Sequence, residues 1–175
     1  MKKLLLSFFT LTILFSCDSK VVQYPVSYSN DDFIKRSQER GKQLLEEEIQ
    51  WFDTYKNQSD LKFNKTESGF WISNQGAKTS TTAKAGDFVR YTFQVTDLDD
   101  NVIYNYNEIG EQKAILGKTD LVRGLHAALQ LIEAGNEAKV LLPSFLAYGG
   151  LGDNDKIGPN QPIIMDIKII DIKKN

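Results

Sequence analysis

The sequence predicts an α+β domain, in which a mainly antiparallel sheet of five or six strands wraps around one short helix and is preceded by an N-terminal helix. Three observations favour this class. Apolar residues have helical spacing within residues 31–60. From about Lys62 onward, short alternating and aromatic-rich segments are separated by turns rich in Gly, Asn and Asp. A single helical stripe of leucines interrupts these segments before Gly135.

The composition limits the chemistry that the chain can perform. It has 175 residues, of which 41% are hydrophobic, and this is enough for one well-filled core. The formal net charge of -2 gives no electrostatic reason to expect nucleic acid as a partner. One His and one Cys nearly exclude a Cys–His catalytic pair or a zinc site of several such ligands. We therefore expect neither a metal nor a cofactor.

Residues 1–17 have the pattern of an export signal. Lys2 and Lys3 precede an uncharged apolar run over 4–15, which is too short to span a bilayer comfortably. A small residue then stands directly before Cys17, as in a bacterial lipobox. The alternative is an ordinary secretory signal with a stray cysteine, but the chain's only cysteine lies where a lipobox requires it. We predict a lipoprotein of the cell envelope, anchored to a membrane through lipid on Cys17 and facing the periplasm.

The segment after this signal is predicted to be a polar tether over 18–30, followed by a helical segment over 31–60. Ser29 or Asn30 can cap this helix, and acidic residues occupy its first turn. The run Glu46–Glu48 is interpreted as a solvated face. The helix either pairs two copies of the chain, or binds another partner, or packs on its own domain, since amphipathicity alone does not separate these readings. Its predicted apolar side consists of Leu45, Ile49, Trp51, Phe52 and Tyr55.

The remaining elements follow from alternation, turn residues and helical spacing. A helix is expected from Thr119 or Asp120 to a glycine cap at Gly135, with His126 facing solvent. Its buried stripe comprises Leu121, Leu125, Leu129 and Ile132. Turns are expected at 74–76 and 79–82. The predicted strands cover 69–73, 87–98, 102–106, a segment ending at 115–117, 137–142 and 163–172.

The segment between two of these strands resembles a calcium-binding loop. Asp97, Asp99, Asn101 and Glu108 occupy positions one, three, five and twelve of that pattern. Val102, however, stands where such a loop needs glycine, and strands rather than helices flank the segment. We favour a hairpin turn over a calcium site.

The stretch 140–159 is the one around which the chain is organised. An apolar strand is broken by Pro143 and leads into Tyr148, which is followed by Gly149 and Gly150. Prolines and paired glycines set backbone directions that other residues resist. A tyrosine at this position offers an apolar ring and one hydroxyl, which suits the edge of a small apolar pocket.

These segments together resemble the FKBP-type peptidyl-prolyl isomerases. The resemblance covers residues 66–172 in order and spacing, and with the lipobox the chain is most similar to the gliding-motility-associated FKBP-type lipoproteins of the Bacteroidota. It implies an FKBP-like domain that isomerises prolyl bonds in exported or envelope proteins, so proline-containing polypeptides are the expected partners. The matching segments are GDFVRYT at 86–92, Leu116-Gly117, LVRGL at 121–125, Ala147-Tyr148-Gly149 and Gly158-Pro159.

The resemblance also implies a set of site residues. Tyr91 matches a pocket-lining tyrosine, and Leu121 and Val122 match the two aliphatic residues before the helix. The N–H of Val122 would donate to a bound carbonyl, and so would the hydroxyl of Tyr148. Ile157 matches an aliphatic residue on the last loop.

Several positions depart from the family pattern. Tyr104 stands where the family usually has Phe, and Asn105 replaces the Asp that follows it, at a position counted among the catalytic ones. The other departures reduce the aromatic walls: Leu125 replaces the Trp of the pocket floor, Met165 replaces a Phe on the last strand, and Gln112 lies near where another Phe is expected. The resemblance therefore leaves two functions open. One is an isomerase, whose activity is weakened by these changes, and the other is a non-catalytic subunit that binds proline motifs in an envelope complex.

Overall fold

The computed structural model describes residues 31–73 and 82–175. The predicted signal peptide at 1–17 with Cys17, the tether at 18–30, the turn at 74–76 and most of the loop at 79–82 lie outside the described residues. These remain predictions.

The predicted N-terminal helix is α2, which covers Asp31–Gln58. The boundary between two units of the chain falls within this helix: the first unit ends at Gln38, and the second covers Glu39–Asn175. None of the described helices combines the length and the apolar character that a membrane crossing requires.

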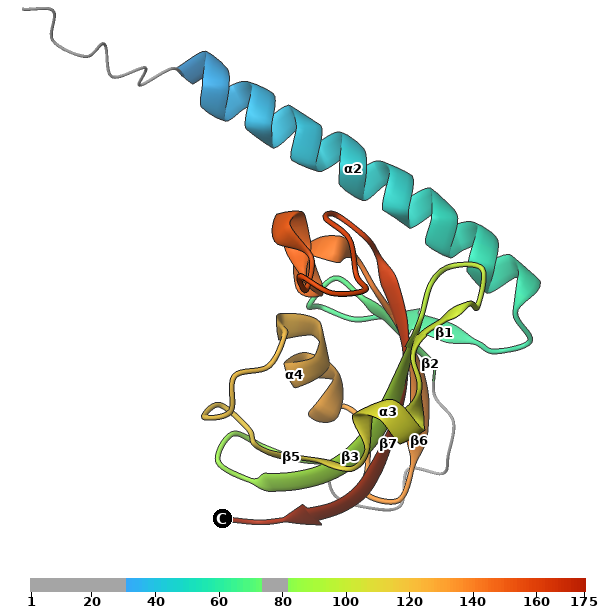
Figure 1. Cartoon of the computed structure of the whole chain (residues 1–175), viewed down its shortest axis with the longest axis vertical. Coiled ribbons are helices and arrows are strands. Elements are labelled where there is room, and N and C mark those ends of the chain that lie inside the picture. The colour runs from blue at the N-terminus through green and yellow to red at the C-terminus, as the bar shows by residue number, and fades with distance from the viewer. Residues whose placement is uncertain (1–30, 74–81) are drawn as a thin grey trace, which may run out of the picture. The chain divides into compact units, whose positions relative to one another are not determined.

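The second unit is built on one antiparallel sheet of seven strands, in the order β1-β2-β6-β7-β3-β4 with β5 paired to β3 (Figure 1). The predicted fold class is confirmed, although we expected five or six strands. The strand missed was β1, because three residues are too few for alternation to be recognised. The strands are β1 (Phe63–Lys65), β2 (Trp71–Ser73), β3 (Phe88–Thr96), β4 (Val102–Tyr104), β5 (Gln112–Ile115), β6 (Glu137–Leu142) and β7 (Ile163–Lys173).

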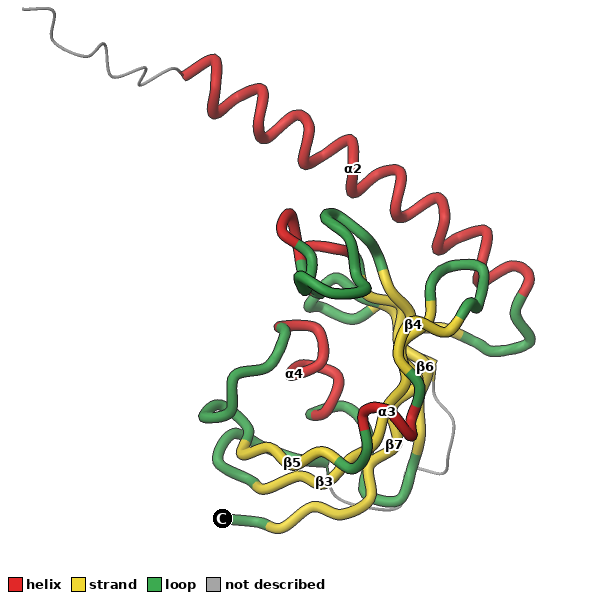
Figure 2. The backbone as a smooth tube through the Cα atoms, viewed as in Figure 1, coloured by secondary structure: helices red, strands yellow, loops and turns green. Residues whose placement is uncertain are grey.

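Short helices lie between these strands (Figure 2). They are α3 (Tyr106–Ile109), α4 (Arg123–Leu129) and the 3₁₀ turns η2 (Ser144–Leu146) and η3 (Gly149–Leu151). The helix predicted from Thr119 or Asp120 to Gly135 was too long at both ends, because α4 begins at Arg123 and ends at Leu129. The N–H groups of Leu131 and Ile132 both donate to the carbonyl of Ala128, which tightens the chain into a turn after Leu129.

His126 on α4 was expected to face solvent, but it is half-buried, and its Nδ1 lies 3.2 Å from Nε2 of Gln130.

The sheet buries apolar side chains on both of its faces, and the alternation of the strands explains why. Val140 packs into the larger core and its neighbour Leu141 into a second cluster, while Met165 and Ile164 divide in the same way. The larger core contains the buried residues of α4, which lies inside the curve of the sheet (Figure 1). The second cluster consists of Phe52, Trp71, Leu141 and Ile164.

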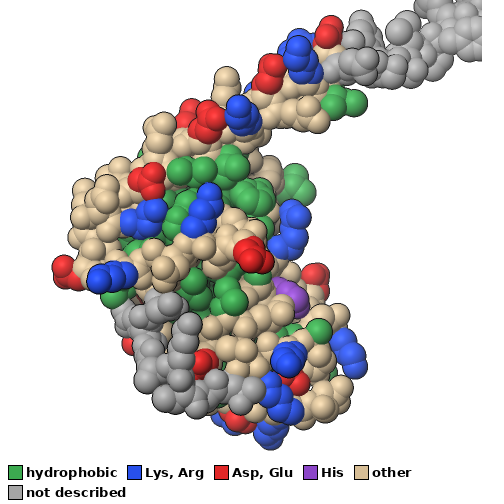
Figure 3. Space-filling view, turned by 180° about the vertical axis from the view of Figure 1, so that it is seen from behind, with side chains coloured by type: hydrophobic (Ala, Val, Ile, Leu, Met, Phe, Trp, Pro, Cys, Tyr) green, Lys and Arg blue, Asp and Glu red, His purple; other side chains and the backbone are tan. Residues whose placement is uncertain are grey.

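The second cluster shows that the C-terminal half of α2 packs on its own domain. Phe52 has no exposed surface, and its ring centroid lies 5.3 Å from that of Trp71. Trp51 was expected on the same side, but it is 45% exposed because a helix turns by about 100° per residue. The ammonium groups of Lys56 and Lys65 lie 4.9 and 5.2 Å from a Trp71 ring centroid. On the face opposite to that of Figure 1, lysine or arginine side chains also lie next to exposed apolar side chains (Figure 3).

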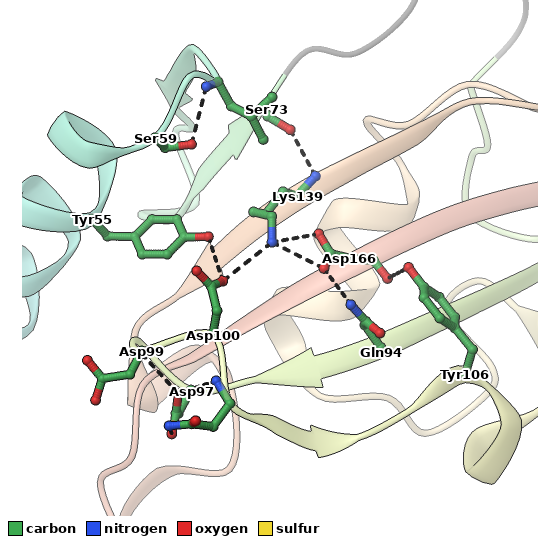
Figure 4. Close-up of polar contacts among 12 residues, drawn as sticks. Tyr55, Ser59, Ser73, Gln94, Asp97, Asp99, Asp100, Tyr106, Lys139 and Asp166 are labelled. Atoms are coloured by element: carbon green, nitrogen blue, oxygen red, sulfur yellow. Dashed lines mark hydrogen bonds and ion pairs between the residues drawn. The ribbon is translucent and has the colours of Figure 1, made fainter.

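A polar network also fixes the end of α2 to the sheet (Figure 4). The hydroxyl of Tyr55 donates to Oδ1 of Asp100 at 2.9 Å, and Nζ of Lys139 lies 3.8 Å from that same oxygen. Lys139 also pairs with Asp166 at 3.0 Å, and Gln94 donates to this second carboxylate. The network therefore connects α2, the turn before β4 and strands β3, β6 and β7.

The segment that resembles a calcium loop is the turn that we predicted between β3 and β4. Oδ1 of Asp97 accepts the N–H groups of Asp99 and Asn101, both at 2.9 Å. The amide of Asn101 donates to the other carboxylate oxygen, also at 2.9 Å. The Asp97 carboxylate therefore stabilises the turn itself.

Candidate active site

A cleft of about 380 Å³ opens beside α4, and its volume is typical of a site for a small ligand. Residues of β3, of β5, of the segment that leads into α4 and of the loop after β6 line it. The lining residues are Tyr91, Phe93, Gln112, Asp120, Leu121, Val122, Leu125 and Tyr148.

Strand β3 contributes two aromatic rings to the cleft. Tyr91 and Phe93 are two residues apart, so they share one face of the strand, and their rings stack with centroids 5.9 Å apart. Burial, and then the neighbouring Tyr148, raise the pKa of Tyr91 to about 12, so its hydroxyl stays protonated at neutral pH. The resemblance did not indicate Phe93 as a site residue. The alternation of β3, which places it on the face of Tyr91, was the signal that could have found it.

The segment that leads into α4 supplies aliphatic walls and one backbone donor. Leu121 and Val122 line the cleft, and Leu125 lies one turn into the helix. Val122 is the N-cap of α4, with φ −58° and ψ 141°. The N–H of an N-cap residue precedes the hydrogen-bonded turns of its helix, so α4 does not use it. It can donate to a carbonyl that enters the cleft.

Tyr148 brings the second donor from the loop after β6. Burial raises the pKa of its hydroxyl, and the nearby Asp153 raises it further, so the group is protonated at neutral pH. Among the described residues, none accepts a hydrogen bond from this hydroxyl. The next residue, Gly149, has φ +61°, a backbone conformation that glycine adopts without strain.

Tyr104 was expected to contact substrate; in the structure it lies outside the cleft lining, and its hydroxyl fixes the last loop. Its hydroxyl donates to Oδ2 of Asp153 at 2.6 Å, and this hydrogen bond is the main reason that its pKa is raised. The other oxygen of Asp153 accepts the N–H groups of Asp155 and Ile157 at 2.9 and 2.8 Å. The ammonium of Lys156 lies 4.6 Å from the centre of the Tyr104 ring. Tyr104 therefore joins β4 to the segment that carries Ile157.

Three other predicted site residues do not line the cleft. Asn105 is exposed, and its side chain caps α3 by accepting the N–H groups of Asn107 and Glu108 at 3.0 Å each. Met165 and Ile157 are 1% and 3% exposed, and both belong to the core that contains Tyr91 and Leu125. They pack in the same core as these two cleft residues.

The cleft is suited to binding and orientation. In residues 31–73 and 82–175, no group of three or more His, Cys, Asp or Glu side chains is placed to hold a metal ion. The cleft instead combines aromatic and aliphatic walls with two hydrogen-bond donors, the Tyr148 hydroxyl and the Val122 N–H. This arrangement can hold an apolar ring and a neighbouring carbonyl.

An apolar cleft between a short helix and the curve of an antiparallel sheet, with two donors for a carbonyl, defines a protein that binds a small apolar group next to a carbonyl. The comparisons with known proteins identify the family. The family described as FKBP-type peptidyl-prolyl cis-trans isomerase matches residues 79–170, which is more than half of the chain. The chain belongs to this family.

Three similar proteins show how far the likeness extends. The outer membrane protein MIP of Legionella longbeachae is 29% identical over 153 residues, which cover 84% of this chain and 63% of MIP. The probable FKBP-type peptidyl-prolyl cis-trans isomerase FkpA of Neisseria meningitidis serogroup B is 26% identical over 160 residues, which cover 79% of this chain and 58% of that protein. The chain thus spans less than two thirds of either relative. The crystal structure of FkpA from Escherichia coli matches with a TM-score of 0.61 at 20% identity, over 99% of this chain and 82% of that one, and supports the fold.

Proposed function

We propose that this protein is a peptidyl-prolyl cis-trans isomerase that acts on proline-containing segments of exported or envelope proteins. The observation that carries the proposal is the placement of two donors in one apolar cleft. The Tyr148 hydroxyl comes from the loop after β6 and the Val122 N–H from the start of α4, and both lie with the stacked rings of Tyr91 and Phe93. Membership of the FKBP-type family supports the same activity.

The reaction is rotation about an X–Pro bond, which needs no nucleophile, acid, base or metal. The uncatalysed barrier is about 18–20 kcal/mol because rotation breaks amide resonance. The twisted amide is less polar than the planar one, so an apolar cleft that excludes water favours it over the ground state. Hydrogen bonds from Tyr148 and Val122 to a substrate carbonyl would hold the peptide while the prolyl bond turns.

A second candidate function is binding of proline motifs without catalysis, as a subunit of an envelope complex. The observation that favours it is that the side chains of Asn105 and Gln112 form hydrogen bonds within the chain. Asn105 is occupied as the cap of α3, and the amide of Gln112 donates to the carbonyl of Ile109 at 2.7 Å. Neither side chain supplies the carboxylate or the aromatic wall expected from the family pattern.

A proteolysis assay coupled to the proline isomer separates the two candidates. We expect the purified protein to accelerate cleavage of a proline peptide whose trans form alone is cut. A rate no higher than background, together with retained binding of the same peptide, would reject the enzyme and favour the binding subunit.

We also propose that the protein is anchored in the cell envelope by lipid on Cys17 and that it serves gliding motility or secretion. The basic and apolar pattern of residues 1–17 supports the anchor. The relative named as an outer membrane protein supports the envelope location. Mass spectrometry of the mature N-terminus should find acyl groups, and Cys17→Ser should release the protein from the membrane fraction.

A motility defect on deletion of the gene would connect the protein to gliding, and normal motility would argue against that role.

A homodimer through the N-terminal helix is a further part of this proposal. Phe33 and Ile34, on the first part of α2, are 59% and 56% exposed, which supports a partner for this part of the helix. Light scattering should give the mass of two chains for the purified protein and of one chain for Phe33→Asp with Ile34→Asp. The same mass for both proteins would reject this interface.

A further inference from the structure

Glu48 is a buried carboxyl group on α2, although the run Glu46–Glu48 was interpreted as a solvated face. It is 1% exposed. Its Oε2 accepts the backbone N–H of Ser144 at 3.0 Å, from a residue 96 positions further along the chain. Its Oε1 has no hydrogen-bond partner among the described residues, and burial raises the pKa of the group. A buried acid at this position needs an explanation beyond the packing of the helix.

The partner of Glu48 begins the turn that leads to Tyr148. Ser144 is the first residue of η2, and hydrogen bonds from Leu146 to Pro143 and from Ala147 to Ser144, at 2.9 and 3.0 Å, close this turn. Tyr148 follows directly. The carboxyl group of Glu48 therefore holds the N-terminus of a compact turn whose other end positions the hydroxyl of the cleft.

The same turn is also fixed to α4. Nη2 of Arg123 donates to the carbonyl of Phe145 at 3.2 Å. At Gly124 a Cβ would lie 2.5 Å from Cδ2 of Leu142 and 3.0 Å from the carbonyl oxygen of Leu146, so only glycine allows this close approach. The turn is thus held between α4, which begins next to Val122, and the side chain of Glu48.

The position of Glu48 is in turn set by the contacts of α2 with the sheet. Phe52 lies one helical turn after Glu48 and fills the second cluster, and Tyr55 joins the network with Asp100 and Lys139 (Figure 4). These contacts fix the part of α2 that belongs to the second unit. A rigid support of this kind is what a side chain needs in order to orient another element.

We infer that Glu48 is a positioning residue for prolyl isomerisation, which holds the Ser144–Leu146 turn so that Tyr148 stays over the cleft. Residues 39–58 of α2 then belong to the functional unit, in addition to the FKBP-like domain itself. The inference rests on the proposed function, because its consequence for the rate requires an active protein. Its consequence for the placement of Tyr148 can be tested whether or not the protein is active.

The test compares Glu48→Leu with Glu48→Gln in the full chain. Leucine removes the acceptor, whereas the amide oxygen of glutamine can still accept the Ser144 N–H. We expect Glu48→Leu to lower kcat about tenfold, the order expected for one lost hydrogen bond to a carboxyl group, with KM changed less. Glu48→Gln should remain within about twofold of the wild type, and the exposed neighbour Glu47→Leu should match the wild type. Equal losses in the Leu and Gln variants, or full activity in folded Glu48→Leu, would overturn the inference.

A second variant keeps the length of the side chain if Glu48→Leu fails to fold. Methionine is unbranched like glutamate and favours a helix, but it offers the Ser144 N–H only a weak sulfur acceptor. We expect Glu48→Met to lose activity to the same extent as Glu48→Leu, and an unchanged rate would contradict the role of this hydrogen bond.

A readout independent of catalysis separates this inference from the proposed function. The NMR resonances of the Tyr148 ring should move in Glu48→Leu and remain in place in Glu48→Gln and Glu47→Leu. If the wild type shows no isomerase activity, the proposed function fails while this shift still tests the positioning role. Unmoved Tyr148 resonances in Glu48→Leu would reject it.

Discussion

The two sides of the cleft use their polar groups in opposite ways. On the side formed by α4 and the loop after β6, the Val122 N–H and the Tyr148 hydroxyl remain available to a ligand. The second side is formed by β5, where Gln112 lines the cleft, together with the preceding β4 and α3, which lie outside the lining. Here the polar groups are used within the chain: Tyr104 binds Asp153, Asn105 caps α3, and Gln112 binds the carbonyl of Ile109. A polar substitution at a wall position of the family pattern can thus stabilise the surrounding loops instead of contacting substrate. We expect the first side to control the rate and the second to control affinity and loop order.

The largest effect should come from Tyr148→Phe, which removes the donor on the first side. Loss of one hydrogen bond of about 1–1.5 kcal/mol lowers kcat/KM by about tenfold. Because the ring is kept, the melting temperature should remain that of the wild type. The matched control is Tyr106→Phe, which removes a hydroxyl 3.4 Å from the carbonyl of Asp166 and outside the cleft lining. An unchanged rate in Tyr148→Phe would remove this residue from the mechanism.

On the second side, Gln112→Phe should strengthen binding of proline peptides by a factor of about three to ten. The added ring buries more apolar surface in the cleft, and each 1.4 kcal/mol gained is tenfold in affinity. This gain is expected in ground state and transition state alike, so KM falls while kcat changes little. Titration of peptide fluorescence measures it. Lys113→Phe is the control, because adjacent residues of β5 point to opposite faces. Weaker binding by Gln112→Phe would show that the amide itself contacts the peptide.

A smaller effect is expected from Tyr104→Phe. The substitution removes the hydrogen bond to Asp153 and so loosens the loop that carries Ile157. We expect kcat/KM to fall about two- to threefold, within the net value of one partly exposed hydrogen bond. Faster amide hydrogen exchange at Asp155 and Ile157 should accompany this fall. A loss as large as that of Tyr148→Phe would mean that both sides of the cleft control the rate.

The smallest effect concerns acid stability at Asp87, a carboxylate outside both sides of the cleft. Its carboxylate accepts the Lys84 N–H at 2.8 Å and pairs with Lys174 at 2.9 Å, and these contacts lower its pKa to about 2. A folded-state pKa below the unfolded value of about 3.9 gives stability that is present above about pH 4 and is lost as pH falls toward 2. Asp87→Asn should therefore lose less stability than the wild type between pH 4 and 2 and keep its activity at pH 7. Identical acid unfolding curves would contradict this account.

The fold could be predicted from the sequence because its signals are local. Alternation and turn residues located β3, β6 and β7, and the leucine stripe located α4, although the predicted helix extended beyond α4 at both ends. The roles of Glu48 and Tyr104 could not be predicted in this way, since their partners Ser144 and Asp153 lie 96 and 49 residues away. A glutamate in an acidic run and a tyrosine at a family phenylalanine position have the same local pattern whether or not such partners exist.

Exchange NMR on a proline peptide is the most direct test of isomerisation in this cleft, because it observes the interconversion of the two isomers in the presence of the protein. We expect cis–trans exchange cross-peaks with catalytic amounts of the wild type and much weaker ones with Tyr148→Phe at equal peptide saturation. Cross-peaks of equal strength with both proteins would contradict the role of the Tyr148 side of the cleft. Binding of the peptide without any exchange cross-peaks would contradict the isomerase function itself.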